Sequence, residues 1–186
     1  VLNKQFIKHA EILSHDAASR AIRDSNVNPD EITHVVFCTV SGQAAPGIDA
    51  KLVISLGLSP HTKRVNLGFV GCQGGSVAIR VASDIAAANP KHRVLAVCCE
   101  ICSLMLHNHD PSCSSEYVAS QLFADGAASF VMGCQPKLSE NKLYEVIASH
   151  CTQHSNHINA IGLNLRMNTW ELVLNNNIPH IVEQNI

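Results

Sequence analysis

The sequence predicts an α/β fold, and three observations support this prediction. Segments of helical period alternate along the chain with short apolar runs typical of strands. The run RVLAVCCEI at 93–101 is apolar on both faces, as expected for a strand that lies between two layers of helices. The 186 residues are 46% hydrophobic and only 15% charged, which is enough apolar material for one domain with a large core.

The helices are predicted by apolar residues at helical spacing and by Pro, Gly and Asn near their ends. The first covers about 5–25 and stops before an Asn-Pro turn. The second covers 47–58, with a proline just before it and a glycine near its end. The third covers about 73–88 and stops at a second Asn-Pro pair, and the segment SEYVASQLFADGAA at 115–128 continues the alternation.

The strands are predicted between these helices, in runs rich in β-branched and aromatic residues. The strong ones cover 34–40, 63–71, 93–101 and 128–134. Two later runs, LYEVIASHCTQH at 143–154 and WELVLN at 170–175, are more polar, so we predict further strands nearer an edge of the sheet. The segment 107–116 is polar and is predicted to be a loop.

Composition excludes several classes of partner. The 13 basic and 15 acidic residues leave a net charge of −2, and no run of like charge predicts binding to nucleic acid or to a membrane surface. No stretch approaches the roughly 20 apolar residues of a membrane span, and the start does not resemble a signal peptide. We therefore expect a cytoplasmic protein whose eight cysteines are reduced thiols.

Cys72 is the strongest candidate for a catalytic residue. It lies where a predicted strand ends in Gly71 and a helix opens with Gly74 and Gly75. The positive end of a helix dipole favours the thiolate form, and the Cys72 N–H is a candidate oxyanion-hole donor. The small neighbours leave room for a substrate carbonyl. The alternative interpretation is a buried structural cysteine at a tight turn.

The cysteine-rich segment CCEIC also raises the question of a metal site. Cys98 and Cys99 are adjacent on a predicted strand, so their side chains point to opposite faces and do not converge on one ion. His107 and His109 follow a few residues later without a typical ligand spacing. The sequence therefore predicts neither a metal nor any other cofactor.

Four stretches of the chain together resemble the chalcone-synthase-like type III polyketide synthases, which are thiolase-like condensing enzymes. They are CTVSGQAAPGIDAKLVISLGLSPHTKRV, GCQGGSVAIR, NPKHRVLAVCCE and SQLFADGAASFVMG, and their order and spacing also match. The ending, from 162 to 186, resembles the family's strand and Pro-started helix. The resemblance covers about residues 10–186.

This resemblance implies a thiolase-like fold with a mixed sheet and a buried nucleophile helix. Residues 1–186 are then a single incomplete domain, most of the N-terminal αβα half of a five-layer αβαβα fold that forms homodimers. The family's catalytic histidine and asparagine belong to the second half, beyond Ile186, and the residues that hold the coenzyme A phosphates come largely from before Val1. We expect a fragment, made by design, by proteolysis or from a split or truncated gene, that is inactive alone.

The resemblance also implies the reaction. Cys72 falls on the family's catalytic cysteine, which takes an acyl group from a coenzyme A thioester. That acyl group is then extended by the carbanion formed when malonyl-CoA loses carbon dioxide. Transfer between two thiols is nearly balanced in energy, which agrees with a cysteine as the acyl carrier.

The same comparison implies a set of residues that contact the substrate. Phe123 falls on the gatekeeper phenylalanine between the coenzyme A entrance and the reaction chamber, although a core aromatic is the alternative. The other implied cavity positions are Ser41, Ala45, Glu100, Cys102 and Met105. For Glu100, a buried hydrogen-bonding carboxylate without contact to substrate is the better-supported alternative.

The sequence departs from the plant members of that family at four positions. Ala45 stands where they have a methionine, Gln73 where they have a phenylalanine, and Cys102 and Met105 where they have threonines. A more apolar tunnel favours an aliphatic or fatty acyl starter over a phenylpropanoid.

Three other functions stay open on the sequence alone. A ketoacyl synthase of fatty acid synthesis has the same nucleophile, although the SGQAAPG and FADGAA motifs favour the polyketide branch. A non-catalytic fragment that only binds and dimerises is the alternative from another class. A cysteine hydrolase has less support, because no histidine has a convincing position relative to Cys72 in the sequence.

Overall fold

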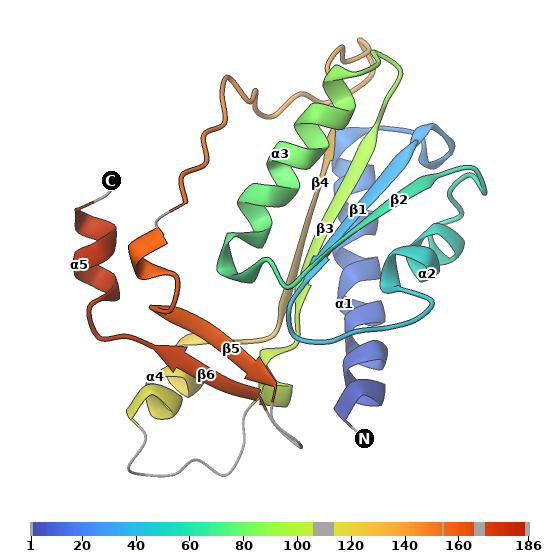
Figure 1. Ribbon diagram of the computed structural model, residues 1–186. Helices are drawn as coiled ribbons and strands as arrows, with labels where there is room; N and C mark the ends of the chain where they lie inside the picture. The colour runs from blue at the N-terminus through green and yellow to red at the C-terminus, as the bar shows by residue number, and fades with distance from the viewer. Residues whose placement is uncertain (1, 106–113, 154, 166–169, 185–186) are drawn as a thin grey trace. The chain divides into compact units, whose positions relative to one another are not determined.

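The computed structural model describes residues 2–105, 114–153, 155–165 and 170–184. The chain forms two compact units (Figure 1). The first, which we call the sheet unit, comprises Val1–Ile101 and Asp125–Ser149. The second, the hairpin unit, comprises Cys102–Ala124 and His150–Ile186. No helix in the described part of the chain is long and apolar enough to span a membrane.

The sheet unit contains a four-stranded mixed sheet in the order β2-β1-β3-β4. Its strands are β1 (His34–Thr39), β2 (Lys63–Gly68), β3 (Val94–Glu100) and β4 (Gly126–Met132). β1 runs parallel to both β2 and β3, whereas β4 is antiparallel to β3. The predicted α/β class with a mixed sheet is therefore confirmed.

Helices cover both faces of this sheet (Figure 1). One face is covered by α1 (Leu2–Ser25) with α2 (Ile48–Ser55), and the other by α3 (Gly74–Ala87). The residues of α1 that point to the sheet recur every four positions, and all of them are buried: Phe6, Ala10, Ser14, Ala18 and Ile22. This spacing places one stripe of a helix against a flat surface, as the periodicity of the sequence predicts.

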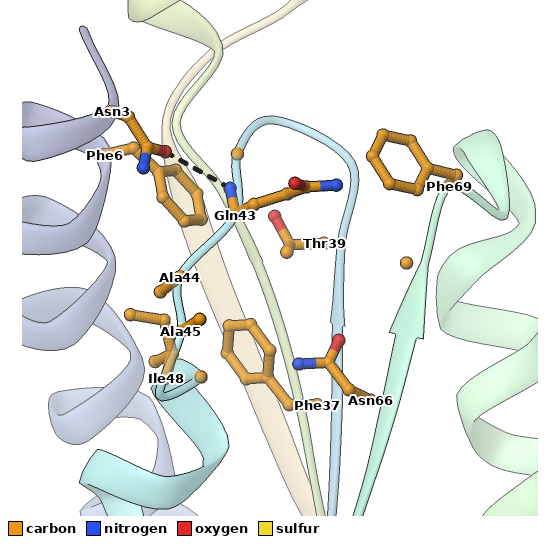
Figure 2. Close-up of a pocket in the computed structure, with 13 residues that line it drawn as sticks. Asn3, Phe6, Phe37, Thr39, Gln43, Ala44, Ala45, Ile48, Asn66 and Phe69 are labelled. Carbon is orange, nitrogen blue, oxygen red and sulfur yellow. Dashed lines mark hydrogen bonds between the residues drawn. The ribbon is translucent and has the colours of Figure 1, made fainter.

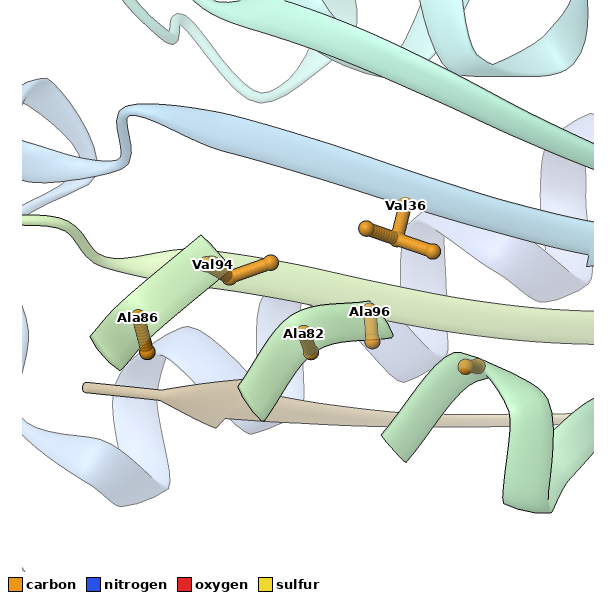
Figure 3. Packing of buried hydrophobic residues seen from close by; sticks show 6 residues of the cluster. Val36, Ala82, Ala86, Val94 and Ala96 are labelled. Carbon is orange, nitrogen blue, oxygen red and sulfur yellow. The ribbon is translucent and has the colours of Figure 1, made fainter. Parts of the chain in front are cut away.

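The opposite helix, α3, packs closely because the centre of its inner face is a row of alanines, with Val81 and Ile85 beside them. Ala78, Ala82 and Ala86 are fully buried and lie over the apolar side chains of β1 and β3, among them Val36 and Val94 (Figure 3). An alanine keeps the helix axis near the strands, because its side chain adds little thickness. This packing fixes the N-terminal end of α3 against the sheet.

A buried ion pair holds the segment that follows β4 on the sheet unit. Arg93, just before β3, meets Glu140 through two hydrogen bonds, Nε to Oε1 at 2.8 Å and Nη2 to Oε2 at 2.9 Å. Their side chains are only 5% and 7% exposed. Arg93 also donates to the carbonyls of Pro90, His92 and Gln135, so its guanidinium joins the backbone just before β3 to the backbone after β4.

The hairpin unit is built around the antiparallel strands β5 (Ile161–Leu165) and β6 (Trp170–Leu174). α4 (Ser114–Leu122) packs against β6. The chain ends in α5 (Ile178–Glu183), whose first turn contains a proline, as the sequence predicts. Short 3-10 turns complete the two units: η1 (Pro29–Glu31), η2 (Gly71–Gln73), η3 (Cys102–Met105) and η4 (Ser155–His157).

One predicted strand is wrong. The described part of the run 143–154, residues 143–153, forms no strand. Its large side chains are exposed, Tyr144 to 91%, and β4, at the edge of the sheet, pairs only with β3. A strand needs hydrogen bonds from a neighbour, and β propensity alone does not supply them. β5 was not predicted as a separate strand from its residue pattern, because its glycine and asparagine weaken that pattern.

Candidate active site

Cys72 lies at the junction between a strand and a helix of the sheet unit. β2 ends at Gly68, the 3-10 turn η2 covers Gly71–Gln73, and α3 begins at Gly74. The thiol of Cys72 is free and its side chain is exposed. The predicted order of strand, cysteine and helix is thus confirmed, and the side chain is accessible to a reagent.

The turn before Cys72 needs an unusual backbone. Phe69 has φ +57° and Gly71 has φ +71°, both in the left-handed region. Glycine adopts that region readily, whereas a phenylalanine there is strained by roughly 1–3 kcal/mol. Such strain is typical of sites where the surrounding structure holds a functional residue in place. Here it reverses the chain direction between β2 and α3 and leaves Cys72 at the tip.

Gly74 is required by close packing at the start of α3. A Cβ atom built on Gly74 lies 2.5 Å from Sγ of Cys38, on β1, which is closer than real contacts allow. Gly75 is different, since a Cβ there has no neighbour within 4 Å. The sequence indicated that small residues leave room for a substrate. The structure adds a second reason at Gly74, the approach of the helix to a strand, and it identifies Cys38 as a supporting residue.

A cavity of about 410 Å³ lies in the sheet unit (Figure 2), and Gly68 and Phe69 at the end of β2 line it, whereas Cys72 does not. Its lining mixes aromatic, amide and small side chains, including Phe6, Phe37, Gln43, Ala45, Asn66 and Phe69. Ala45 is exposed in the loop before α2, next to a cis peptide bond to Pro46. Figure 2 shows Ala45 beside α1 and Phe69 on the opposite side of the cavity. Ala45, which the family resemblance implies as a cavity position, lines this cavity, and its contact with substrate stays a prediction.

Glu100 and Ser41 form a hydrogen-bond network behind that loop. Both carboxylate oxygens of Glu100 accept from the backbone N–H of Val40, at 3.0 and 3.1 Å, and Oε2 accepts from the N–H of Ser41 at 2.9 Å. Thr39 donates its hydroxyl to Oε2 at 3.2 Å. The buried hydroxyl of Ser41 accepts from the N–H of Ile101 at 2.8 Å. These contacts fix the end of β1, and they favour a positioning role for Glu100.

Replacing Glu100 with alanine is expected to lower the free energy of unfolding by about 2–4 kcal/mol. The substitution leaves the N–H groups of Val40 and Ser41 without their acceptor, and each lost partner costs roughly 1–3 kcal/mol. Glu100→Gln keeps one amide oxygen and is expected to lose less. Urea unfolding of the wild type and the two variants measures these free energies. An equal loss of stability in Glu100→Gln and Glu100→Ala contradicts the expectation.

Three of the predicted cavity residues belong to the hairpin unit. Cys102 begins η3 and is half-buried, and Met105 ends η3, with a side chain outside the part that the structure describes. Phe123 follows α4 directly, and its N–H donates to the carbonyl of Ala119 at 3.0 Å. The Phe123 ring is partly exposed, so it is not a fully buried core aromatic. Contact of Cys102, Met105 and Phe123 with the substrate stays a prediction.

Among the described residues, no group of three or more His, Cys, Asp or Glu side chains is arranged to hold a metal ion. His107 and His109 lie outside the described residues. Cys98 and Cys99 face opposite sides of the sheet, as predicted, since Cys98 packs with the α3 cluster and Sγ of Cys99 lies 3.9 Å from the Ala10 carbonyl on α1.

Three comparisons with known proteins agree with one another. The family model described as "Chalcone and stilbene synthases, N-terminal domain" matches residues 3–136. "Probable polyketide synthase 1" of Dictyostelium discoideum is 37% identical over 185 residues, which cover 100% of this chain and 6% of that protein. The crystal structure of the C-terminal type III polyketide synthase domain of Steely1, a type I/III hybrid from Dictyostelium, superposes with a TM-score of 0.95 at 37% identity. That match covers 99% of this chain and 50% of the solved one.

Proposed function

This chain belongs to the chalcone and stilbene synthase family, as a type III polyketide synthase fragment, and from that premise we propose that Cys72 is its acyl-carrying nucleophile. The observation that carries the proposal is the position of Cys72, exposed at a strained turn between β2 and the first turn of α3. A nucleophile that exchanges acyl groups with coenzyme A must be accessible and held rigidly, and this turn supplies both properties.

In the first step, the Cys72 thiolate attacks the carbonyl carbon of an acyl-CoA thioester. A new C–S bond forms, the bond to the coenzyme A sulfur breaks, and coenzyme A leaves as a thiolate that takes up a proton. The 14-residue helix α3 begins two residues after Cys72, so the positive end of its dipole favours the negative charge of the developing oxyanion.

In the second step, malonyl-CoA loses carbon dioxide, and the resulting carbanion attacks the thioester carbonyl on Cys72. A C–C bond forms, the bond to Sγ breaks, and the Cys72 thiolate is regenerated. The chain spans half the length of the solved relative. We therefore assign the groups that stabilise the carbanion, a histidine and an asparagine in the family, to the remaining half, and the acyl-transfer step to this chain.

The substrates that we propose are an aliphatic acyl-CoA starter and malonyl-CoA, without a metal or other cofactor. The choice of starter rests on the small and apolar residues at the implied cavity positions Cys102, Met105 and Ala45, of which Ala45 lines the cavity beside Phe6 and Phe37 as well as the amides of Gln43 and Asn66. The small side chain of Ala45 leaves space for a long alkyl chain, and aromatic side chains on the wall shield such a chain from water. Phe123 is proposed to orient the malonyl unit, and the complete protein to be a cytoplasmic homodimer, as the family resemblance implies.

Incubating the purified chain with a fatty acyl-CoA is expected to add one acyl group to its intact mass. Cys72→Ala is expected to lose the adduct completely, because the only proposed nucleophile is gone. Cys134→Ala is the matched control, since Cys134 is also exposed and lies away from the β2–α3 junction, and it should keep the adduct. An unmodified wild-type chain, or an adduct that survives Cys72→Ala, contradicts the proposal.

A further inference from the structure

We propose that Cys38 and Cys98 form a reversible disulfide beneath the start of α3, under oxidation by a hydroperoxide such as hydrogen peroxide. Neither thiol forms or breaks a bond in the acyl transfer proposed for Cys72, although Cys38 supports the start of α3. The inference concerns a modification site on the sheet unit, and it does not depend on the substrate of Cys72.

The first argument is the register of the sheet. Cys38 on β1 and Cys98 on β3 are directly paired Cα partners in neighbouring parallel strands. Neighbouring strands lie about 4.8 Å apart, and disulfides join Cα atoms that are about 4.4–6.8 Å apart. Paired positions also project their side chains from the same face, here the face covered by α3, where Cys98 packs against the alanines of α3 and Sγ of Cys38 lies next to Gly74.

The second argument is the state of the two thiols. They share a hydrogen bond, which together with burial raises the pKa of Cys38. The same hydrogen bond lowers the pKa of Cys98, against the opposing effects of burial and of Glu100. Cys98 is only half-buried, whereas Cys38 is buried. The pair therefore has one thiol suited to react with the oxidant and a second one beside it to resolve the product.

The chemistry balances with peroxide as the only co-reactant. The Cys98 sulfur attacks one peroxide oxygen, the O–O bond breaks, and water leaves after one proton transfer, which forms a sulfenic acid. The Cys38 sulfur then attacks the sulfenic sulfur, the S–O bond breaks, and a second water leaves. Two thiols are oxidised by two electrons, and one peroxide is reduced to two waters. A dithiol reverses the reaction by thiol exchange.

The third argument is what lies above the pair. The Cβ position of Gly74 is 2.5 Å from Sγ of Cys38, so α3 begins in direct contact with this sulfur. A disulfide draws Sγ of Cys38 to about 2.05 Å from the second sulfur. That shift changes the packing under Gly74, two residues after Cys72. We expect the oxidised chain to alkylate at Cys72 several-fold more slowly than the reduced chain.

The test uses the full chain carrying Cys72→Ala, which removes oxidation of the exposed candidate nucleophile. After treatment with hydrogen peroxide, the protein is denatured, its free thiols are labelled with a maleimide, and its intact mass is measured. The expected result is the loss of two labelled thiols and of about 2 Da in the monomer, both restored by a dithiol. Tryptic digestion should join the peptide 24–51, which contains Cys38, to the peptide 94–137, which contains Cys98.

Two single substitutions in that background assign the bond. Cys98→Ser is expected to abolish the cross-link, whereas Cys99→Ser is expected to keep it, because Cys99 is a buried neighbour on the opposite face of the same strand. A cross-link that survives Cys98→Ser overturns the proposal. A digest of the oxidised wild-type chain that lacks the joined peptides also overturns the proposal. This measurement does not depend on the folding of any variant. The rate of Cys72 alkylation is then measured before and after peroxide in the wild-type chain and in the Cys98→Ser chain, because peroxide also oxidises the exposed Cys72 itself. A larger loss of rate in the wild type is expected, and an equal loss in the two proteins overturns the proposed effect on Cys72.

Discussion

Replacing Glu140 with alanine is expected to lower the free energy of unfolding by about 3–5 kcal/mol, the largest loss of stability that we expect from a single substitution in this chain. The substitution leaves the buried guanidinium of Arg93 without its carboxylate, and breaking a buried pair costs about this much. Equilibrium unfolding in urea measures the change. The exposed pair of Lys142 and Glu145 is the matched control, and Lys142→Ala is expected to leave the urea midpoint unchanged.

The ion pair of Arg93 and Glu140 also makes the stability of the folded chain depend on pH. Burial opposes ionisation of Glu140, but hydrogen bonds from Arg93 and from the Lys137 N–H outweigh it and lower the pKa of Glu140. A carboxylate with a lowered pKa contributes stability above its unfolded value, about 4.3, and this contribution is lost as the pH falls through the folded value. The substitution Glu140→Gln should therefore lower the free energy of unfolding, relative to the wild type, by less at pH 3 than at pH 7. An equal loss at both values contradicts the role of the carboxylate charge.

Gly74→Ala is expected to destabilise the chain by about 1–3 kcal/mol and to slow the alkylation of Cys72. The new Cβ meets Sγ of Cys38 at 2.5 Å, so the start of α3 must move away from β1. Gly75→Ala is the matched control, because its Cβ meets nothing within 4 Å. Alanine favours a helix over glycine by up to about 1 kcal/mol, so Gly75→Ala should keep or raise the stability.

A double substitution tests whether the Cys38 contact is the cause. Cys38→Ala removes the sulfur that the Gly74 Cβ meets, so Gly74→Ala is expected to cost less in a Cys38→Ala background than in the wild type. Thermal or urea unfolding of the four proteins gives the coupling free energy. A coupling of zero means that Gly74 is required for another reason, and the account of the β2–α3 junction is then wrong.

The order of elements in the sheet unit could be predicted from the sequence, because the signals are local. The stripe of α1, the Asn-Pro stops and the apolar runs of β1 and β3 each lie within one segment. The run 143–154 was mispredicted for the opposite reason. Its residues have the composition of a strand, but a strand exists only where a neighbour pairs with it, and that property is not local.

The residues of the candidate site also divide into those with a local signal in the sequence and those without one. Cys72 could be identified because its glycines and the neighbouring strand and helix are adjacent in sequence. Cys38 could not, since its contact with Gly74 depends on how closely α3 packs on β1. The pairing of Arg93 with Glu140 joins residues 47 positions apart, and neither lies in a motif. A buried arginine before a strand is the only signal, and it does not identify the carboxylate.

The central claim, that Cys72 carries the acyl group, is tested most directly by locating the adduct in the wild-type chain. After incubation with a fatty acyl-CoA, digestion with trypsin yields the peptide 65–80, in which Cys72 is the only cysteine. The account predicts that this peptide, and no other, gains the mass of one acyl group. An acyl group on the peptides that contain Cys134 or Cys151, with peptide 65–80 unmodified, contradicts the account.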